Sequence, residues 1–457
     1  MPETRNSDSH QPELRKALRL TDGIALVIGI TIGSGIYSTP SIISGYFESF
    51  SGIAVAWVGV AFFIGIGALI YAELGTRLPT TGGEYVYLTT CYGPFVGFMF
   101  GWSQLFIIRT SAAAGLSIIA ANYVGYFFDL SPTAHIAVAL SIIWGLGIFN
   151  YVGVQWASLF QKVSTLLKVV GLIALAAGGV FFLSSAANLL GTTLPTTTGV
   201  GPFGNVIAAL MLIVFTHIGF DRVGYVAGEI SNPRAVIPKT MAIGTAIIIA
   251  IYWLMNTTYH YSLGMEGMRG TTTPAADVAT ILIGSVGAGA VAILAIVSAA
   301  GSINGTMMSA TRVYYAMARD GLFFKSLDYV HETFRTPTRA IMAHCTWASV
   351  LLVLRGSFET LAAGMVFAIL IFYTLTTLAV FKLRRRKIGE DIAWKMPLYP
   401  LLPIIYLVGV VGLLIVRIIF EFEKSLIDFA FVASGLPVSY FWLRKGKKQN
   451  ADDAAAD

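Results

Sequence analysis

The sequence predicts an all-α membrane protein with about twelve transmembrane helices. Apolar residues make up 56% of the 457-residue chain and charged residues only 12%, with a mean hydropathy of +0.74. Ordinary globular domains carry about 25% charged residues. Apolar stretches of about 20 residues, the length that crosses a bilayer, recur along the whole chain. Residues 1–19 are polar and basic, and they lack the short apolar core of a cleavable signal.

Short loops rich in Pro and Gly separate the apolar stretches, so the expected spans can be placed in order. They are expected at residues 20–46, 52–77, 94–128, 132–150, 157–185, 204–230, 236–262, 283–319, 338–354, 358–382, 397–420 and 425–443. Cytoplasmic loops carry an excess of Lys and Arg. With both termini in the cytoplasm, inner loops and tails hold 22 of the 30 Lys and Arg residues, and outer loops hold four. Topology therefore explains the net charge of +6, and no nucleic-acid partner is expected.

The first five spans run in the opposite sense to the next five, and an interrupted helix opens each set. The interruptions are Gly33-Ser34-Gly35 in span 1 and residues 215–221 in span 6. Backbone that breaks inside a bilayer is tolerated only where it lines a cavity or holds a ligand. We therefore expect an inverted repeat of five spans followed by two further spans. The predicted divisions are a cytoplasmic tail 1–19, repeats 20–185 and 204–382, spans 11 and 12 at 397–443, and a cytoplasmic tail 444–457.

The break in span 1 is expected to start a new helix at mid-depth. Its first N–H groups, at Ser34, Gly35 and Ile36, would point into a cavity, where a helix N-terminus favours a carboxylate. The Ser34 hydroxyl adds a donor. Before the break, the carbonyls of Thr31 and Ile32 present partial negative charge. The alternative reading is that these glycines only let helices pack closely.

The break in span 6 is expected to add carbonyl groups at Phe215, Thr216 and Ile218. An anion site beside a cation site matches a zwitterionic α-amino acid. His217 lies between these carbonyls, and we expect a neutral ring there and weaker apparent affinity at acid pH. The ring of Phe220 is expected to cover the cavity as a gate, or else to pack in the core. The candidate site residues are therefore Thr31, Ile32, Ser34, Gly35, Ile36, Phe215, Thr216, His217, Ile218 and Phe220.

Lys168 is the main intramembrane charge. It lies about eleven residues into span 5, roughly 16 Å from the cytoplasmic end at 1.5 Å per residue. Such a charge indicates function by default, and we expect its ammonium to stand where a coupling cation would bind, tying span 5 to span 1. The alternative is a tilted span whose lysine reaches the interface. Arg109 is expected to serve a structural pair or a gate, with a substrate role as the alternative. Asp221 is expected to cap a helix, with direct substrate contact as the alternative.

No catalytic motif, cofactor-binding motif or metal-ligand cluster is found in the sequence. We therefore expect no enzyme activity, no cofactor and no metal site. The two cysteines, Cys91 and Cys345, fall in or near spans and imply no disulfide framework.

At these motifs the chain resembles the amino acid–polyamine–organocation superfamily, in particular the L-type amino acid exchangers and the neighbouring cationic amino acid transporters. Residues 32–37 read IGSGIY and residues 219–221 read GFD. His217-Ile218 stands where the family more often has Tyr-Gly or Tyr-Ile. The stretches that carry the resemblance are 32–40, 72–79, 82–87, 108–111, 219–238, 317–321 and 396–400.

The resemblance implies a LeuT-type fold and sodium-independent transport of neutral L-amino acids by alternating access, often as exchange. It assigns the substrate carboxylate to Ser34 and Gly35, and the amino group to the carbonyls of Thr31, Phe215 and Ile218. It also matches Phe220 to an aromatic gate and Lys168 to a span 5 lysine. The loop between spans 3 and 4 lacks the cysteine that links animal exchangers to a heavy subunit, so no such partner is expected. Short loops favour a prokaryotic inner membrane.

Two other transport classes remain open from the sequence. A proton-coupled amino acid symporter needs a deep titrating group, for which His217 and Lys168 are the candidates. A cationic amino acid or polyamine carrier needs buried acids, and Asp221 is the only acidic residue expected at mid-depth.

Overall fold

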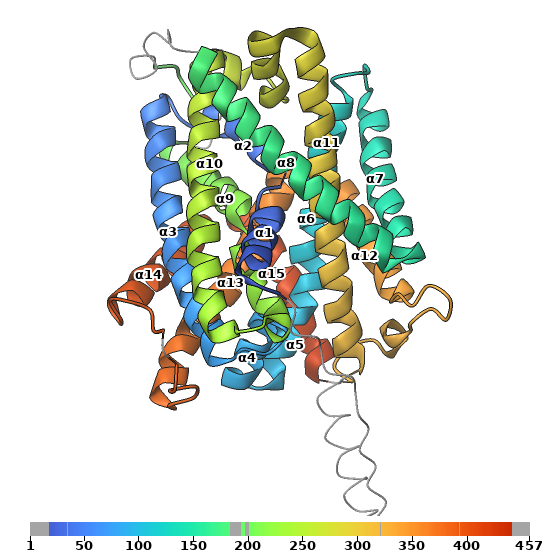
Figure 1. The fold of residues 1–457 in the computed structure, drawn as a ribbon, viewed down its shortest axis with the longest axis vertical. Helices are drawn as coiled ribbons and strands as arrows, with labels where there is room; N and C mark the ends of the chain where they lie inside the picture. The colour runs from blue at the N-terminus through green and yellow to red at the C-terminus, as the bar shows by residue number, and fades with distance from the viewer. Residues whose placement is uncertain are drawn as a thin grey trace, which may run out of the picture.

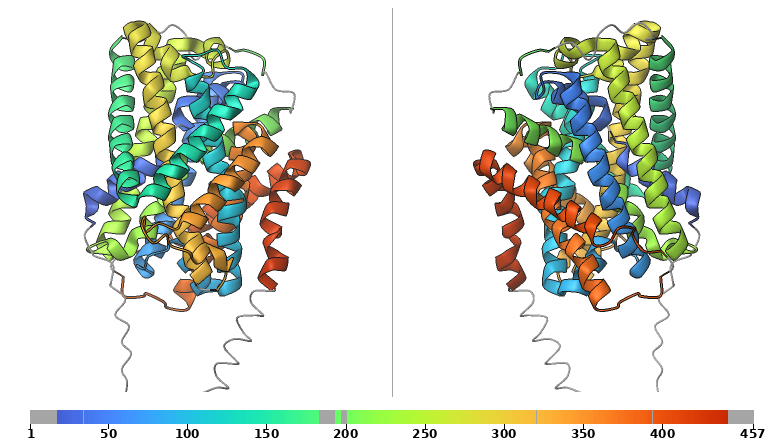
Figure 2. Two further views of the ribbon diagram at one scale, coloured as in Figure 1. Left: turned by 90° about the vertical axis from the view of Figure 1, so that its right-hand side faces the viewer. Right: turned by 90° about the vertical axis from the view of Figure 1, so that its left-hand side faces the viewer.

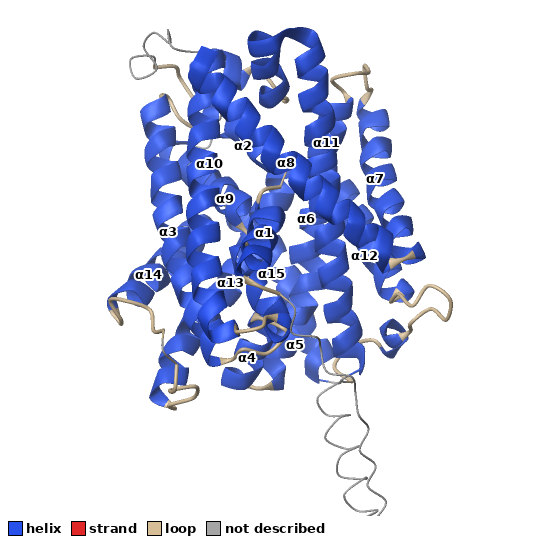
Figure 3. Cartoon of the chain, in the orientation of Figure 1, coloured by secondary structure: helices blue, strands red, loops and turns tan. Residues whose placement is uncertain are grey.

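The computed structural model describes residues 18–33, 35–182, 193–196, 201–319, 321–392 and 394–440, and these form an all-helical bundle (Figures 1 and 3). The elements are α1 (Leu20–Thr31), α2 (Gly35–Ser44), α3 (Phe50–Arg77), α4 (Glu84–Tyr92), α5 (Pro94–Ser103), the π-helix η1 (Gln104–Ile108), α6 (Arg109–Val124), α7 (Pro132–Val152), α8 (Val154–Phe182), α9 (Gly201–His217), the 3-10 helix η2 (Phe220–Glu229), α10 (Pro233–Arg269), α11 (Pro274–Arg319), η3 (Lys325–Asp328), α12 (Thr338–Arg355), α13 (Phe358–Arg385), α14 (Leu401–Phe420) and α15 (Phe422–Ala433).

The helices follow the expected order of spans. In the described part of the chain, nine helices are long and apolar enough to cross a membrane, and the bent pair α1–α2 makes up to ten. The two other expected spans correspond to α12, with 18 residues, and to α15, with 12 residues before a turn. Parts of one expected loop, residues 263–282 between spans 7 and 8, are helical instead. Backbone angles outside the helical region at Gly264 (φ 65°) and Gly284 (φ 75°) divide these segments from the long helices α10 and α11.

Spans 1 and 6 are both interrupted, as the sequence predicts. The axes of α1 and α2 differ by 44°, and α9 ends at His217. Gly219 has φ 136°, which a side chain rarely adopts, and a Cβ there would lie 2.6 Å from the Thr31 hydroxyl. The two breaks therefore touch each other through Gly219 and Thr31.

The segment after the break in span 6 differs from the expected α-helix. η2 is a 3-10 helix whose N-cap is Gly219, so the prediction of Asp221 as a helix cap is wrong. Asp221 instead lies in the first turn, where its carboxylate pairs with Arg222 at 3.3 Å. The tighter helix keeps this segment close to α1, and a backbone bridge joins Leu18 to Ile230.

The core of the bundle surrounds the broken helices. α1 packs on α10, α6 packs on α11 and α13, and α8 packs on α11. Figure 2 shows the C-terminal helices α14 and α15, in red, at the opposite edge of the molecule from α8, in green. The helices that border the breaks are thus held from several sides.

Buried ion pairs brace both ends of α13. At its C-terminal end, Glu73 of α3 accepts hydrogen bonds from Arg77 and Arg384, at 2.8 and 2.6 Å, and from the backbone N–H of Met396. At the other end, Asp428 of α15 pairs with Arg355 and with Arg417 of α14. Removing one partner of a buried pair is costly, so these contacts hold the bundle closed around its centre.

Candidate functional site

The C-terminal carbonyls of α1 show how the break in span 1 is stabilised. A helix end leaves its last four carbonyls without helical partners. The carbonyl of Gly29 accepts a hydrogen bond from the Lys168 ammonium of α8, and that of Thr31 accepts one from the N–H of Gly33 at 2.8 Å. Lys168 is completely buried. The expected contact between span 5 and span 1 is therefore present.

Tyr252 of α10 joins the two broken helices. Its hydroxyl lies 2.9 Å from the carbonyl oxygen of Thr31 and 2.9 Å from that of Thr216. A tyrosine hydroxyl has one proton, so the two carbonyls compete for a single donor. The partial negative charge that the carbonyls present at the breaks is thus only partly neutralised.

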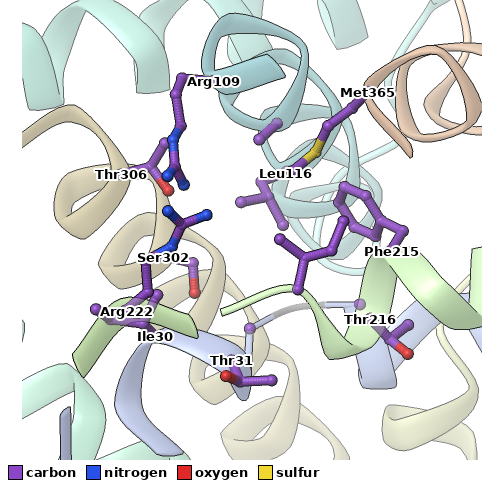
Figure 4. A pocket seen from close by; sticks show the side chains of 14 residues that line it. Ile30, Thr31, Arg109, Leu116, Phe215, Thr216, Arg222, Ser302, Thr306 and Met365 are labelled. Atoms are coloured by element: carbon purple, nitrogen blue, oxygen red, sulfur yellow. The ribbon is translucent and has the colours of Figure 1, made fainter. Parts of the chain in front are cut away.

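A cavity lies between the breaks and helices α6, α11 and α13 (Figure 4). It is narrow, with about 50 Å³ open to the centres of water-sized molecules, which is room for a few waters. An amino acid fits only if the lining side chains move apart. The lining residues are Ile30, Thr31, Gly33, Gly35, Arg109, Ala112, Leu116, Phe215, Thr216, Ile218, Arg222, Ser302, Thr306 and Met365.

Five of the predicted site residues border this cavity: Thr31, Gly35, Phe215, Thr216 and Ile218. They come from the two breaks, as expected from the sequence. Gly35 begins α2, and a Cβ there would lie 3.0 Å from a methyl carbon of Thr216. The approach of the two breaks at this point is therefore close enough to exclude a larger side chain.

The other predicted site residues lie elsewhere. Ser34 falls outside the described residues. Ile32 and Ile36 are completely buried and do not line the cavity. Their expected contribution through backbone groups stays a prediction.

His217 lies behind the break, away from the cavity. Its ring packs on Trp57 and Tyr252, with ring centroids 5.6 and 5.0 Å apart. Nδ1 lies 2.8 Å from the carbonyl oxygen of Ile213 and donates to it, while Nε2 has no partner in the described residues. The His217 ring thus contacts Tyr252, whose hydroxyl contacts the carbonyls of Thr31 and Thr216.

Phe220 is also packed away from the cavity. It is completely buried, and its ring meets the edges of Tyr71 and Tyr373 at 5.5 and 6.1 Å. A different aromatic pair lies above the cavity: Phe215 contacts Phe358 of α13 at 5.2 Å, with the ring planes at 83°. Phe358 lines a second, wider cavity, so this pair lies between the two cavities.

Two arginines give the cavity a positive charge that the sequence reasoning did not assign to it. Figure 4 shows the guanidinium groups of Arg109 and Arg222 pointing toward each other, near Ser302 and Thr306. Arg222 is 3% exposed and Arg109 is 5% exposed. An intramembrane charge indicates function, so this signal was present for Arg222. For Tyr252 and Ser302 no sequence signal existed, because neither residue belongs to a motif or breaks a helix.

Comparisons with known proteins agree with this geometry. The amino acid permease family matches residues 18–441. The serine/threonine exchanger SteT of Bacillus subtilis (strain 168) is 31% identical over 441 residues, which cover 95% of this chain and 98% of SteT. The b(0,+)-type amino acid transporter 1 of Mus musculus is 27% identical, over 96% of this chain and 90% of its own. The large neutral amino acids transporter small subunit 2 of Homo sapiens is 26% identical, over 95% and 82%.

These matches extend over nearly the whole chain and agree with its helical membrane fold. The family accounts for the twelve spans and for the pair of broken helices that meet at the central cavity. The chain belongs to the amino acid permease family of the amino acid–polyamine–organocation superfamily, and it is a multi-pass membrane transporter of amino acids rather than an enzyme.

Proposed function

We propose that the protein exchanges neutral L-amino acids across the membrane by alternating access, without sodium. One observation carries this proposal: the first turn of α2 at Gly35 and the carbonyl ends of α1 and α9 border the same cavity. A helix N-terminus favours an α-carboxylate, and the carbonyl end of a helix favours an α-ammonium group. This arrangement supports recognition of the part that all α-amino acids share.

The charge of the cavity argues against cationic substrates. Among its lining residues that the structure describes, none is Asp or Glu, whereas two are Arg. A lysine side chain or a polyamine would enter without a counter-charge, at a large cost in a low-dielectric site. The apolar lining residues Ala112, Leu116, Phe215 and Met365 suit a small neutral side chain.

Sodium independence is supported by Lys168. Its buried ammonium already donates to the Gly29 carbonyl at the break in span 1. A fixed positive charge in this place does the electrostatic work of a bound cation. Exchange is supported by the relative SteT, which is a serine/threonine exchanger.

We also propose a membrane topology, based on the loops in the sequence. The charge asymmetry of the loops supports an orientation with both termini in the cytoplasm. The short loops support a location in a prokaryotic inner membrane. The inverted repeats are proposed to extend over 20–185 and 204–382, with spans 11 and 12 at 397–443. The loop 125–131 contains no cysteine, which supports activity without a disulfide-linked heavy subunit.

The test is efflux from proteoliposomes preloaded with labelled L-serine. An exchanger releases label only when serine or another neutral amino acid is present outside, and it does so equally in sodium and in potassium buffer. Efflux without any external amino acid contradicts exchange. Uptake that needs an inward proton gradient favours the proton-coupled alternative, and stronger competition by lysine or putrescine than by any neutral amino acid contradicts the substrate class.

A further inference from the structure

The electrostatic balance of the central cavity is incomplete. The ion pairs of the described residues give Arg109 no acidic partner; its Nε donates to the Gln104 side-chain oxygen at 2.7 Å. Arg222 lies 3.3 Å from Asp221 Oδ2, yet none of its three nitrogens makes a hydrogen bond within the described residues. Asp221 therefore compensates one arginine in part and the other not at all.

A second acidic group, Glu84, lies within electrostatic range of Arg222 but outside the cavity. Glu84 is completely buried and accepts hydrogen bonds from the hydroxyls of Tyr71 and Tyr225. The Arg222 guanidinium lies over the ring of Tyr225 at 5.0 Å, on the way from Glu84 to the cavity. Glu84 adds negative charge on the side of Arg222 that faces away from the lining residues, since it is not among them. Within the described residues no ion pair gives Arg109 an acidic partner, so the charge inside the cavity stays positive on its side.

The cavity also presents neutral donors at the same place. Ser302 is buried, and its hydroxyl has no hydrogen-bond partner in the described part of the chain. A Cβ at Gly33 would lie 3.0 Å from this hydroxyl, so Ser302 stands directly beside the break in span 1. Thr306 lines the cavity one helical turn further along α11.

Two facing guanidinium groups in a buried site repel each other strongly unless an anion lies between them. Guanidinium groups also have the fork geometry that fits carboxylates. We propose that Arg109, Arg222 and Ser302 form an anion subsite of the central cavity. Its occupant is either the side-chain carboxylate of an acidic amino acid or a free halide that accompanies a neutral substrate.

This inference rests on the proposed amino acid transport and extends its substrate class from neutral to acidic amino acids. The apolar residues Leu116 and Met365 then contact the aliphatic part of the side chain, while the arginines hold its end. An isosteric amide such as glutamine carries no charge to neutralise them. The subsite therefore predicts preference for L-glutamate over L-glutamine, or dependence of neutral uptake on chloride.

The first test measures binding directly, as the thermal unfolding temperature of the purified protein in detergent. The probes are sodium chloride against sodium gluconate at equal ionic strength, and L-glutamate against L-glutamine. In the wild type, chloride or glutamate is expected to raise the unfolding temperature. The second test measures competition by glutamate and glutamine against labelled L-serine uptake into proteoliposomes, with and without chloride.

Arg222→Gln is expected to lower glutamate or chloride affinity about tenfold or more, because it removes hydrogen bonds to a charged group. Arg312→Gln is the matched control, since Arg312 is an exposed arginine of α11 that donates to the Met308 carbonyl. If Arg222→Gln does not fold, Ser302→Ala deletes a single hydroxyl of the same subsite and is expected to act in the same direction.

The outcomes separate the two occupants. Glutamate that binds, displaces chloride and is transported identifies the side-chain carboxylate. Chloride that stabilises the protein and supports serine uptake, while glutamate does neither, identifies the halide. The subsite is overturned if neither anion acts on the wild type, or if folded Arg222→Gln and Ser302→Ala respond to both as the wild type does. If the wild type takes up no amino acid at all, the proposed function is wrong. The anion subsite is then still tested by the unfolding temperature in detergent, which does not depend on transport.

Discussion

The ammonium of Lys168 donates a hydrogen bond to the carbonyl oxygen of Gly29, and so joins α8 to the broken span 1. The contact places a positive charge at the C-terminal end of α1, where the helix dipole favours it. Gly29 permits this approach, because a Cβ there would lie 2.6 Å from a methyl carbon of Thr165. The broken span 1 is thus anchored to α8 by charge and by close packing together.

We predict that Lys168→Ala lowers the exchange rate more than it lowers expression. The Gly29 carbonyl loses its donor, and a buried carbonyl without a partner costs about 1–3 kcal/mol. Lys162→Ala, at an exposed lysine of the same helix, is the control and is expected to keep the wild-type rate. Serine exchange is measured in sodium and in potassium buffer. Stimulation of the wild type by a sodium gradient of more than a few-fold would sink this assignment.

We predict that Tyr252→Phe weakens the coupling of the two breaks. The substitution keeps the ring contacts with Trp57 and His217 but removes the donor shared by the carbonyls of Thr31 and Thr216. Loss of these hydrogen bonds is expected to cost about 1–2 kcal/mol of stability and to lower the exchange rate. Thermal unfolding and serine exchange are the measurements. Tyr261→Phe, at an exposed tyrosine of α10, serves as the control, and equal behaviour of the two variants would contradict the role.

We predict that Gly35→Leu abolishes amino acid binding while the protein still folds. A branched side chain at Gly35 meets Thr216 and fills the place of the substrate carboxylate. Gly59→Leu is the control, because nothing lies within 4 Å of a Cβ at Gly59. Binding is measured by competition against labelled serine. Amino acid amides should fail to compete with the wild type, and an amide as effective as its parent acid would refute the carboxylate site.

We predict that acid pH weakens apparent affinity through His217. Its Nδ1 already donates to Ile213, and protonation of Nε2 would add a charge beside Tyr252 and the carbonyls that we propose to hold the substrate ammonium. His217→Asn and His217→Tyr are expected to flatten the loss of affinity at acid pH. The measurement is the half-saturating serine concentration at each pH. Unchanged profiles in both variants would reduce His217 to a packing residue, and acid-stimulated uptake lost in both would favour proton coupling.

Much of the fold follows from local properties of the chain. Apolar length predicts the spans, and glycine runs predict the breaks, because both depend on residues adjacent in sequence. The spacing of apolar residues does not distinguish an α-helix from a 3-10 helix, and here the structure corrects the prediction. The segment after Gly219 is a 3-10 helix, and Asp221 lies in its first turn beside Arg222. Residues 263–269 and 274–282 are helical as well, although the sequence predicts a loop between spans 7 and 8 there.

The candidate site, too, could be predicted from the sequence only in part. The positions of the two breaks and the depth of Lys168 follow from the sequence, since both depend on residue spacing along the apolar segments. Which side chains share the cavity depends on tertiary packing. The hydroxyl of Tyr252 reaches the breaks from α10, and Arg109 faces Arg222 from another span. These contacts join residues far apart in the chain, and their directions depend on how the helices pack around the breaks.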